Sequence, residues 1–176
     1  DKLALTAQEA FQASMGVAGD ANSGVIAPIH LLKAILDSSE NNMNAIFKRV
    51  GLDPGALKQA VDTEVANAPK TSGAMPMAVP SQDLIKIIDN AVKIAETLGD
   101  SYATTEHLLM ALAEDRGNAG QVLKSQGLTP ANLKQAYEDL RGDTRVNSQT
   151  EKTQFASLEQ YGQNLTEMAR QGKLDP

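Results

Sequence analysis

An internal repeat constrains the fold of this chain more than any other feature of its sequence. Gly51 to Val61 (GLDPGALKQAV) and Gly127 to Tyr137 (GLTPANLKQAY) are identical at seven of eleven positions and lie 76 residues apart. Upstream, Pro28 to Leu36 (PIHLLKAIL) aligns with Thr105 to Ala113 (TEHLLMALA) at an offset of 77. Two copies of one unit are expected to fold as two similar halves that share a core.

The duplication defines the expected domain organisation. Residues 1–141 are predicted to form one domain, with a first repeat at 1–65 and a second at 81–141. Between them, Ala66 to Pro80 (ANAPKTSGAMPMAVP) holds three prolines and one glycine, which interrupt both helical and strand periodicity. This segment is therefore predicted to be the linker between the repeats.

Residues 142–176 differ from both repeats. Gly142 to Gln154 carries one apolar residue in thirteen, so we expect the packed core to end at Arg141 and this stretch to be a mobile, solvated linker. Helical spacing returns in Phe155 to Gln171, which matches neither repeat. Because the chain also begins at Asp1 without a methionine, we expect a piece of a longer protein that continues into another module.

Apolar residues in the two repeats have helical spacing, and no convincing strand is present. Asp53-Pro54 and Thr129-Pro130 each place a capping oxygen before a proline at the first helical position, and Ser81 and Thr104 are further N-cap candidates. We therefore predict an all-α fold of two pseudo-symmetric four-helix repeats packed as one globular domain. The predicted helices span residues 3–18, 28–37, 42–50, 53–66, 81–98, 104–114, 118–126 and 129–141.

Composition excludes several classes of function. The 176 residues include no cysteine, which excludes disulfides, thiolate nucleophiles and zinc ribbons. A net charge of -6 repels phosphate backbones, so nucleic acid is not an expected partner. No apolar run reaches the length of a membrane span, and the N-terminus lacks the pattern of a signal peptide, so no membrane partner is expected either.

Motifs for catalysis are also missing from the sequence. It contains no GxxxxGK[ST] phosphate loop, GxSxG elbow, HExxH helix or D-x-D-x-D-G calcium loop. We therefore expect no enzyme activity, no catalytic residues, no bound cofactor and no metal in this chain. A hydrolase whose active site matches none of these motifs remains an alternative to a chain without enzyme activity.

Four polar residues are candidates for a functional role, and they lie close in sequence to the Leu-Leu pair of each repeat, Leu31-Leu32 or Leu108-Leu109. His30 and His107 occupy equivalent positions, which favours a shared structural role in the two halves over a ligand-binding role. Asp100 lies in a Gly-Asp turn and Glu106 in the first turn of a predicted helix. Acidic side chains stabilise helix N-termini, so a capping role and a functional role both remain open for this pair.

The predicted helix at 81–98 has an unusually wide apolar arc, close to half its circumference. One edge carries Ile85 and Val92, and the other carries Ile87 and Ile94. Neighbouring helices of the same repeat can cover both edges. Alternatively, one edge faces a groove between the repeats that receives an apolar segment of a partner.

The doubled pattern of a long helix, HLL-x-A-[IL]-[LA], G-L-x-P and LKQA resembles the Clp N-terminal repeat domain. The tail YGQNLTEMARQGKLDP is similar to the segment that leads into the first ATPase module of ClpB-type AAA+ disaggregases. The resemblance implies a non-catalytic, cytoplasmic domain that binds unfolded or aggregated polypeptide and helps deliver it to the pore of a homohexamer. ATP and magnesium would belong to the missing modules, and a DnaK-type chaperone system would be a partner. The isolated piece is expected to be a monomer.

The resemblance also suggests site residues. The family's acidic pair corresponds to Asp100 and Glu106, and its threonine position is held by Ala4, with Ser81 as the equivalent in the second repeat. His107 stands where a relative places an apolar residue beside the groove. Together with the apolar edge of the long helix, this gives a candidate polypeptide-binding site of Ala4, Ile87, Ile94, Asp100, Glu106 and His107. The alternative function is an adaptor-docking domain of a ClpA/ClpC-type protease unfoldase, which would bind a folded partner.

Overall fold

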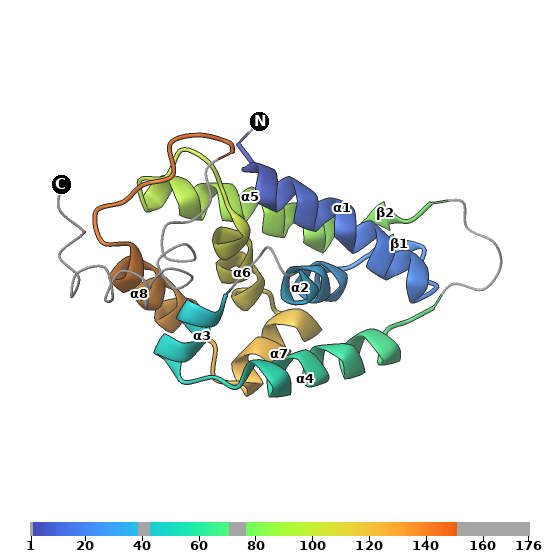
Figure 1. The fold of residues 1–176 in the computed structure, drawn as a ribbon. Coiled ribbons are helices and arrows are strands. Elements are labelled where there is room, and N and C mark those ends of the chain that lie inside the picture. The colour runs from blue at the N-terminus through green and yellow to red at the C-terminus, as the bar shows by residue number, and fades with distance from the viewer. Residues whose placement is uncertain (1, 39–42, 71–76, 151–176) are drawn as a thin grey trace, which may run out of the picture.

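The computed structural model describes residues 2–38, 43–70 and 77–150, and within these ranges the chain forms eight helices and two short strands (Figure 1). The predicted all-α fold is confirmed, and the helices begin and end within two residues of their predicted bounds. No described helix has the length and apolar character to cross a bilayer. The elements are α1 Leu5–Asp20, β1 Val25–Ile26, α2 Pro28–Asp37, α3 Asn44–Val50, α4 Pro54–Asn67, β2 Val79–Pro80, α5 Gln82–Thr97, α6 Thr105–Ala113, α7 Asn118–Ser125 and α8 Pro130–Arg141.

Side-chain caps explain why three of the helices begin where the sequence predicts. The Ser81 hydroxyl accepts a hydrogen bond of 3.0 Å from the Leu84 N–H at the start of α5. Asp53 caps α4 and Thr129 caps α8 in the same way, each followed by a proline at the first helical position. These oxygens satisfy backbone donors that have no partner inside the helix.

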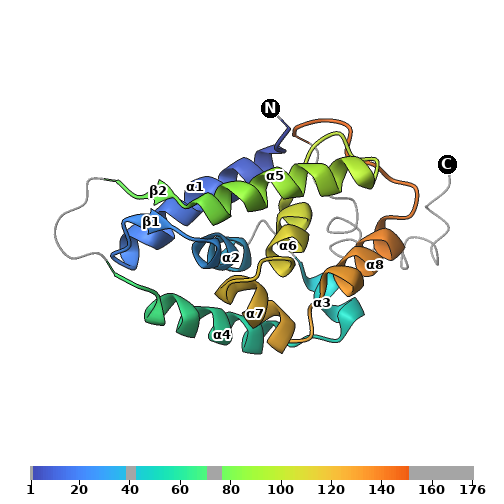
Figure 2. The same ribbon diagram turned by 180° about the vertical axis from the view of Figure 1, so that it is seen from behind.

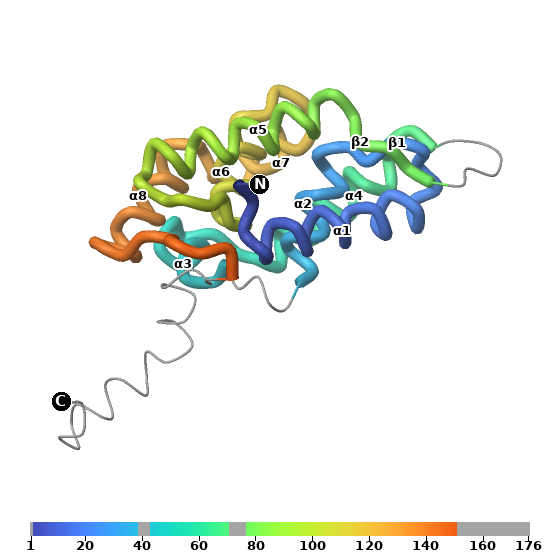
Figure 3. The backbone as a smooth tube through the Cα atoms, turned by 90° about the horizontal axis from the view of Figure 1, so that it is seen from above, coloured from blue at the N-terminus to red at the C-terminus, as the bar shows by residue number. Residues whose placement is uncertain are grey.

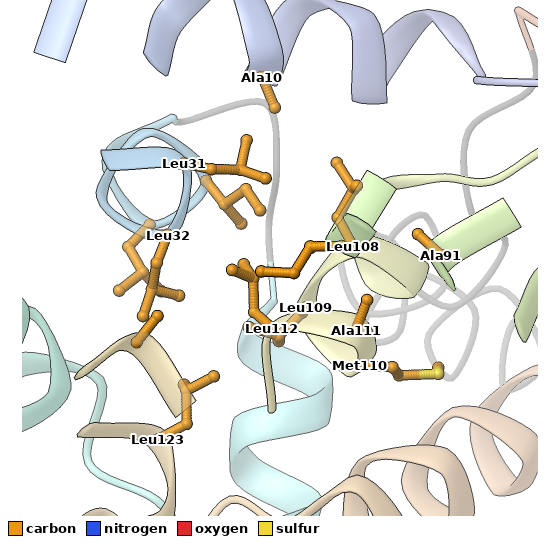
Figure 4. Close-up of a cluster of buried hydrophobic side chains, with 14 of the residues drawn as sticks. Ala10, Leu31, Leu32, Ala91, Leu108, Leu109, Met110, Ala111, Leu112 and Leu123 are labelled. Atoms are coloured by element: carbon orange, nitrogen blue, oxygen red, sulfur yellow. The ribbon is translucent and has the colours of Figure 1, made fainter. Parts of the chain in front are cut away.

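The core lies around α2 and α6, which are buried along almost their whole length. Both views place α1 and α5 on one side of this pair and α4 and α7 on the opposite side, with α3 and α8 next to each other at one end of the molecule (Figures 1 and 2). Leu31 and Leu32 of α2 and Leu108, Leu109 and Leu112 of α6 are all 1% exposed or less and meet at the centre (Figure 4). The two Leu-Leu pairs of the repeat therefore form one shared core.

Reciprocal backbone pairing joins the halves. Leu3, which precedes α1, pairs with Ala103 in the turn before α6, and the Ala4 N–H donates to the Ala103 carbonyl at 2.8 Å. In the equivalent place, β2 precedes α5 and pairs in parallel with β1, and the Ser81 N–H donates to the Ile26 carbonyl at 3.0 Å. Helix packing is reciprocal as well, since α3 packs on α8 and α7 packs on α4. The two repeats are thus related by a pseudo-twofold axis.

The strands β1 and β2 correct the expectation that the chain has none. Val25 lies opposite Val79, and Ile26 lies opposite Pro80. Because each strand is only two residues long, it cannot show the alternation of apolar and polar residues by which a strand is recognised in a sequence. The linker between the repeats therefore ends as a strand rather than as an irregular loop.

The segment after α8 corrects a second expectation. The core does not end at Arg141, because Val146 is only 4% exposed. The Ser101 N–H donates to the Val146 carbonyl at 2.8 Å, and the Leu5 N–H donates to the Gln149 carbonyl at 2.8 Å. From above, this segment runs back from α8 towards the start of α1 (Figure 3). The rest of the predicted linker and the predicted helix at 155–171 lie outside the described residues.

Candidate functional site

A pocket of about 310 Å³ lies on the second repeat, between α5, α6 and the start of α8. Its apolar lining is formed by Ile94 of α5, Leu98 directly after α5, Met110 of α6, and Pro130 and Ala131 of α8. The expected groove lies between the two repeats, whereas residues of the second repeat alone line this pocket.

The wide apolar arc of α5 accounts for the pocket. Leu84, Ala91 and Ala95 face the core and are buried. Ile94 is turned about 100° from Ala95 around the helix, so it lies at the border of the core, where it is half-buried and reaches the pocket. Ile85, on the opposite edge, is 42% exposed and does not line it. Of the edge formed by Ile87 and Ile94, only Ile94 reaches the pocket, because Ile87 is buried.

Polar side chains complete the pocket lining. The Asn90 amide donates a hydrogen bond of 3.0 Å to the Glu114 carboxylate, which joins the end of α6 to α5. Lys93 on α5 and Lys134 on α8 also line the pocket, and both are exposed. Within the described ranges, neither of these ammonium groups forms an ion pair. The pocket therefore combines an apolar lining with two lysine ammonium groups that form no ion pair within the described residues.

The equivalent position in the first repeat is occupied by an ion-pair cluster. Lys33 stands where the second repeat has Met110, since α2 aligns with α6 at the offset of 77. Its ammonium lies 3.0 Å from the Asp37 carboxylate and 2.6 Å from that of Asp62. These hydrogen bonds raise the pKa of Lys33, so it stays charged and bound to its partners. Because the second repeat has methionine in place of this lysine, it is apolar at the position where the first repeat is charged.

The structure separates the six candidate residues into three groups. Ile94 lines the pocket. Ile87 and Ala4 are buried in the core and lie outside the pocket lining. Ala4 is the N-cap of α1, where it has no side chain to cap with, whereas its equivalent Ser81 caps α5. The remaining three, Asp100, Glu106 and His107, are buried and line no part of the pocket.

Asp100 is the centre of a buried polar network and is 3% exposed. Its Oδ2 accepts hydrogen bonds from His107 Nε2 at 2.9 Å, from the Tyr137 hydroxyl at 3.0 Å and from Arg141 Nη1 at 2.5 Å. Its Oδ1 accepts from the Val146 N–H at 2.8 Å. One carboxylate thus joins the α5–α6 turn, α6, α8 and the segment after α8.

The network keeps this carboxylate ionised. Burial alone would raise the pKa of Asp100, but the hydrogen bonds from His107, the Val146 N–H and Arg141 outweigh burial and lower it to about 2. Burial, followed by the charge of Asp100, raises the pKa of Tyr137, so its hydroxyl stays protonated and donates. Arg141 lies 4.6 Å from the centre of the Tyr137 ring, which adds a cation–π contact.

Hydrogen bonding fixes the tautomer of His107. Its Nδ1 accepts from the Thr104 backbone N–H at 2.8 Å and therefore carries no proton. Its Nε2 then donates to Asp100. The Thr104 hydroxyl donates to Glu106 Oε1 at 2.8 Å, which holds Glu106 in the first turn of α6. This geometry agrees with a capping role for Glu106. Asp100, in contrast, does not act only in its turn, because its carboxylate accepts four hydrogen bonds from other segments.

As predicted, the two histidines share a structural role, but they share only the hydrogen bond accepted by Nδ1. His30 Nδ1 accepts from the Ala27 N–H at 2.9 Å, as His107 does from Thr104. The first repeat has Ser23 in the position of Asp100, and His30 Nε2 is buried without a hydrogen-bond partner. Burial lowers the pKa of His30.

Sequence reasoning missed four residues that matter here. Tyr137 and Arg141 stand where the first repeat has valines, at the offset of 76. A polar residue that replaces an apolar one in an otherwise matched helix is a signal that could have identified both. Met110 and Lys134 required knowledge of how α6 and α8 pack, because neither is unusual within its own helix.

The sequence of this chain is similar to those of known proteins. Residues 2–126 match the Clp repeat (R) N-terminal domain family. The chain is 32% identical over 172 residues to the chaperone protein ClpB of Bacteroides thetaiotaomicron and 37% identical over 170 residues to that of Corynebacterium glutamicum. These alignments cover 98% and 96% of the chain but 20% of each relative. The chain therefore spans about a fifth of the length of these relatives.

Solved structures share the fold. The Hsp104 N-terminal domain of Candida albicans superposes with a TM-score of 0.74 at 22% identity, covering 85% of this chain and 97% of that one. A ClpV N-domain in complex with a VipB peptide gives 0.61 at 16% identity, covering 78% and 85%. With the family match over residues 2–126 and the homology to ClpB N-terminal regions, this chain belongs to the Clp repeat (R) N-terminal domain family.

Proposed function

We propose that this chain is a non-catalytic domain that binds apolar segments of unfolded or aggregated polypeptide at the pocket between α5, α6 and α8. The single observation that carries the proposal is the apolar base of the pocket, formed by the half-buried Ile94 and by Leu98 and Met110, which are 7% and 3% exposed. The equivalent part of the first repeat holds charges instead. An apolar side chain that leaves water for this base is stabilised in proportion to the area it buries.

The lining suits a site that accepts many sequences. The base offers few fixed hydrogen-bond donors or acceptors, so it can discriminate little beyond apolar character. Met110 has an unbranched, flexible side chain that adapts to ligands of different shape. Weak binding is expected, because ordering an unfolded segment costs conformational entropy.

The proposal includes a larger assembly that follows from the relatives. In it, the domain precedes ATPase modules of a ClpB-type disaggregase, which form a cytoplasmic homohexamer, receive the captured polypeptide at their pore and work with a DnaK-type system. ATP and magnesium act there, and this chain binds no cofactor. Relatives named as ClpB chaperones support this choice over adaptor docking in a ClpA/ClpC-type unfoldase. A ClpV N-domain holding a peptide supports polypeptide binding.

The test places the same substitution on both edges of α5. Ile94→Asp puts a charge into the pocket base, while Ile85→Asp puts it on the exposed opposite edge. Titration of the labelled domain with reduced, alkylated lactalbumin measures binding, and thermal unfolding measures stability. We expect Ile94→Asp to weaken binding at least about tenfold, since a charge in an apolar site costs more than 1.4 kcal/mol, with a nearly unchanged melting temperature. Ile85→Asp should bind as the wild type does.

Two outcomes contradict the proposal. In the first, Ile94→Asp binds as well as the wild type, which removes the pocket from the site. In the second, Ile94→Asp melts much earlier than Ile85→Asp, which shows that Ile94 belongs to the core rather than to an open edge.

A further inference from the structure

We infer that the pocket selects apolar segments that are flanked by acidic residues, because its cations are left without partners. The inference rests on the proposed function and deepens it by naming the class of segment. It depends on Lys93 and Lys134, which line the pocket from two different helices.

These two lysines differ from other cations that the repeats place between elements. Lys33 is bonded to two carboxylates, Arg141 to Asp100, and Arg49 of α3 to Asp139 of α8 at 3.1 Å. In the part of the chain that the structure describes, Lys93 and Lys134 have no carboxylate within ion-pair distance. The pocket therefore holds two ammonium groups with which a ligand can form ion pairs.

Acidic side chains one helical turn from the lysines, including Glu96, form no ion pair with them in the described structure. Asp89 and Glu138 lie one helical turn away, but they line no part of the pocket and pair with neither lysine in the described structure. Glu114 does line the pocket, and the Asn90 amide already donates to it. The pocket lining thus carries two cations and one anion, although the whole chain has a net charge of -6.

The helix ends at the pocket add to this charge. The first turn of α8, at Pro130 and Ala131, presents the positive end of the helix dipole. The negative end of α5 lies at Leu98, and its carbonyl accepts a hydrogen bond from Arg141. The α8 end therefore favours an anionic group beside the apolar base, and the Arg141 guanidinium offsets the opposite effect of the α5 end.

The experiment compares three labelled peptides with the same short apolar core, flanked by aspartate, serine or lysine. Fluorescence anisotropy gives the dissociation constant of each with the whole chain at low and high salt. We expect the aspartate-flanked peptide to bind about fivefold more tightly than the serine-flanked one, as two exposed charge pairs would give. The lysine-flanked peptide should bind most weakly, and salt should reduce the difference.

Charge reversal supplies the matched comparison. The double variant Lys93→Glu/Lys134→Glu should reverse the order of the aspartate and lysine peptides and leave the serine peptide nearly unchanged. Lys86→Glu/Lys58→Glu makes the same change in net charge at exposed positions outside the pocket lining, one of them the equivalent of Lys134 in the first repeat. This control should keep the wild-type order.

The outcomes separate the two proposals. If the aspartate and serine peptides bind equally well, or if both double variants change the order alike, the charge preference is wrong while apolar binding stands. If no peptide binds and Ile94→Asp behaves as the wild type with unfolded protein, the pocket is not a binding site and both proposals fail.

Discussion

At the scale of single residues, the two equivalent histidines show how a partner decides the role of a side chain. His30 and His107 each accept the N–H of the residue before their helix. His107 continues into a carboxylate, whereas His30 ends at a buried nitrogen with no partner. The second repeat consequently gains a bridge from its turn to α8, and the first repeat gains a group whose protonation the fold opposes.

Replacing Asp100 tests the weight of that bridge. Asp100→Ala leaves the Arg141 guanidinium buried without its counter-charge, so we expect the free energy of unfolding to fall by about 3–5 kcal/mol. Ser23→Ala, the equivalent change in the first repeat, removes one exposed hydroxyl and should cost less than about 1 kcal/mol. Urea unfolding of both variants measures the difference. Equal losses would mean that the network contributes nothing specific.

Stability should also depend on pH through His30. Burial holds its pKa below 6.5, so the unfolded chain binds a proton where the folded chain does not, and stability falls as the pH drops through 6.5. Asp100, with a pKa lowered to about 2, loses its contribution only below about pH 3.8, so the two effects separate.

The variant His30→Asn isolates this effect. Asn132 already shows that an asparagine at the third helical position accepts the N-cap N–H, from Thr129 at 2.9 Å. The variant therefore keeps the cap and removes the titration. Urea midpoints measured on either side of pH 6.5 should change less in His30→Asn than in the wild type. The same change in both proteins would contradict the assignment to His30.

At the scale of elements, α5 could be predicted from its own residues, whereas the segment after α8 could not. α5 carries a regular apolar arc and a serine cap, so its bounds could be predicted from local residues. Its buried face could be predicted only in part, because Ile87, expected on an edge that faces a groove, is buried in the core. The segment after α8 has one apolar residue, Val146, in a polar run, and no periodicity marks it. Its burial depends on Asp100 and Ser101, which lie more than forty residues earlier.

Truncation tests whether that segment belongs to the fold. A chain that ends at Arg141 loses the burial of Val146 and the backbone hydrogen bonds to Ser101 and Leu5, whereas a chain that ends at Thr150 keeps them. We expect the shorter chain to be less stable by about 2 kcal/mol, from one buried valine and the lost hydrogen bonds. Equal urea midpoints would restore the boundary that composition suggests.

The candidate site was less predictable than the fold for the same physical reason. Ile94 was identified because it lies on a helix edge, which a sequence reveals directly. Met110 and Lys134 become neighbours of Ile94 only when α6 and α8 pack on α5. Asp100 was selected by resemblance, but its partners Tyr137 and Arg141 come from a helix whose position the repeat alone does not specify.

At the scale of the whole molecule, the pseudo-twofold arrangement is symmetric in its backbone and asymmetric in its chemistry. The segment before each long helix pairs with the turn of the other repeat, so each half completes the other. The corresponding side chains have diverged: an ion-pair cluster occupies one half, and a pocket with a buried network occupies the other.

The reciprocal pairing has a consequence for how such a molecule can specialise. Two separate copies joined across a true twofold axis would form an isologous dimer, in which every substitution appears twice and any cost is doubled. Covalent linkage removes that restriction, because lysine at position 33 and methionine at position 110 are now independent choices. One half can therefore keep the strongest packing and ion pairs, while the other carries the open, adaptable surface that would weaken both halves of a symmetric dimer.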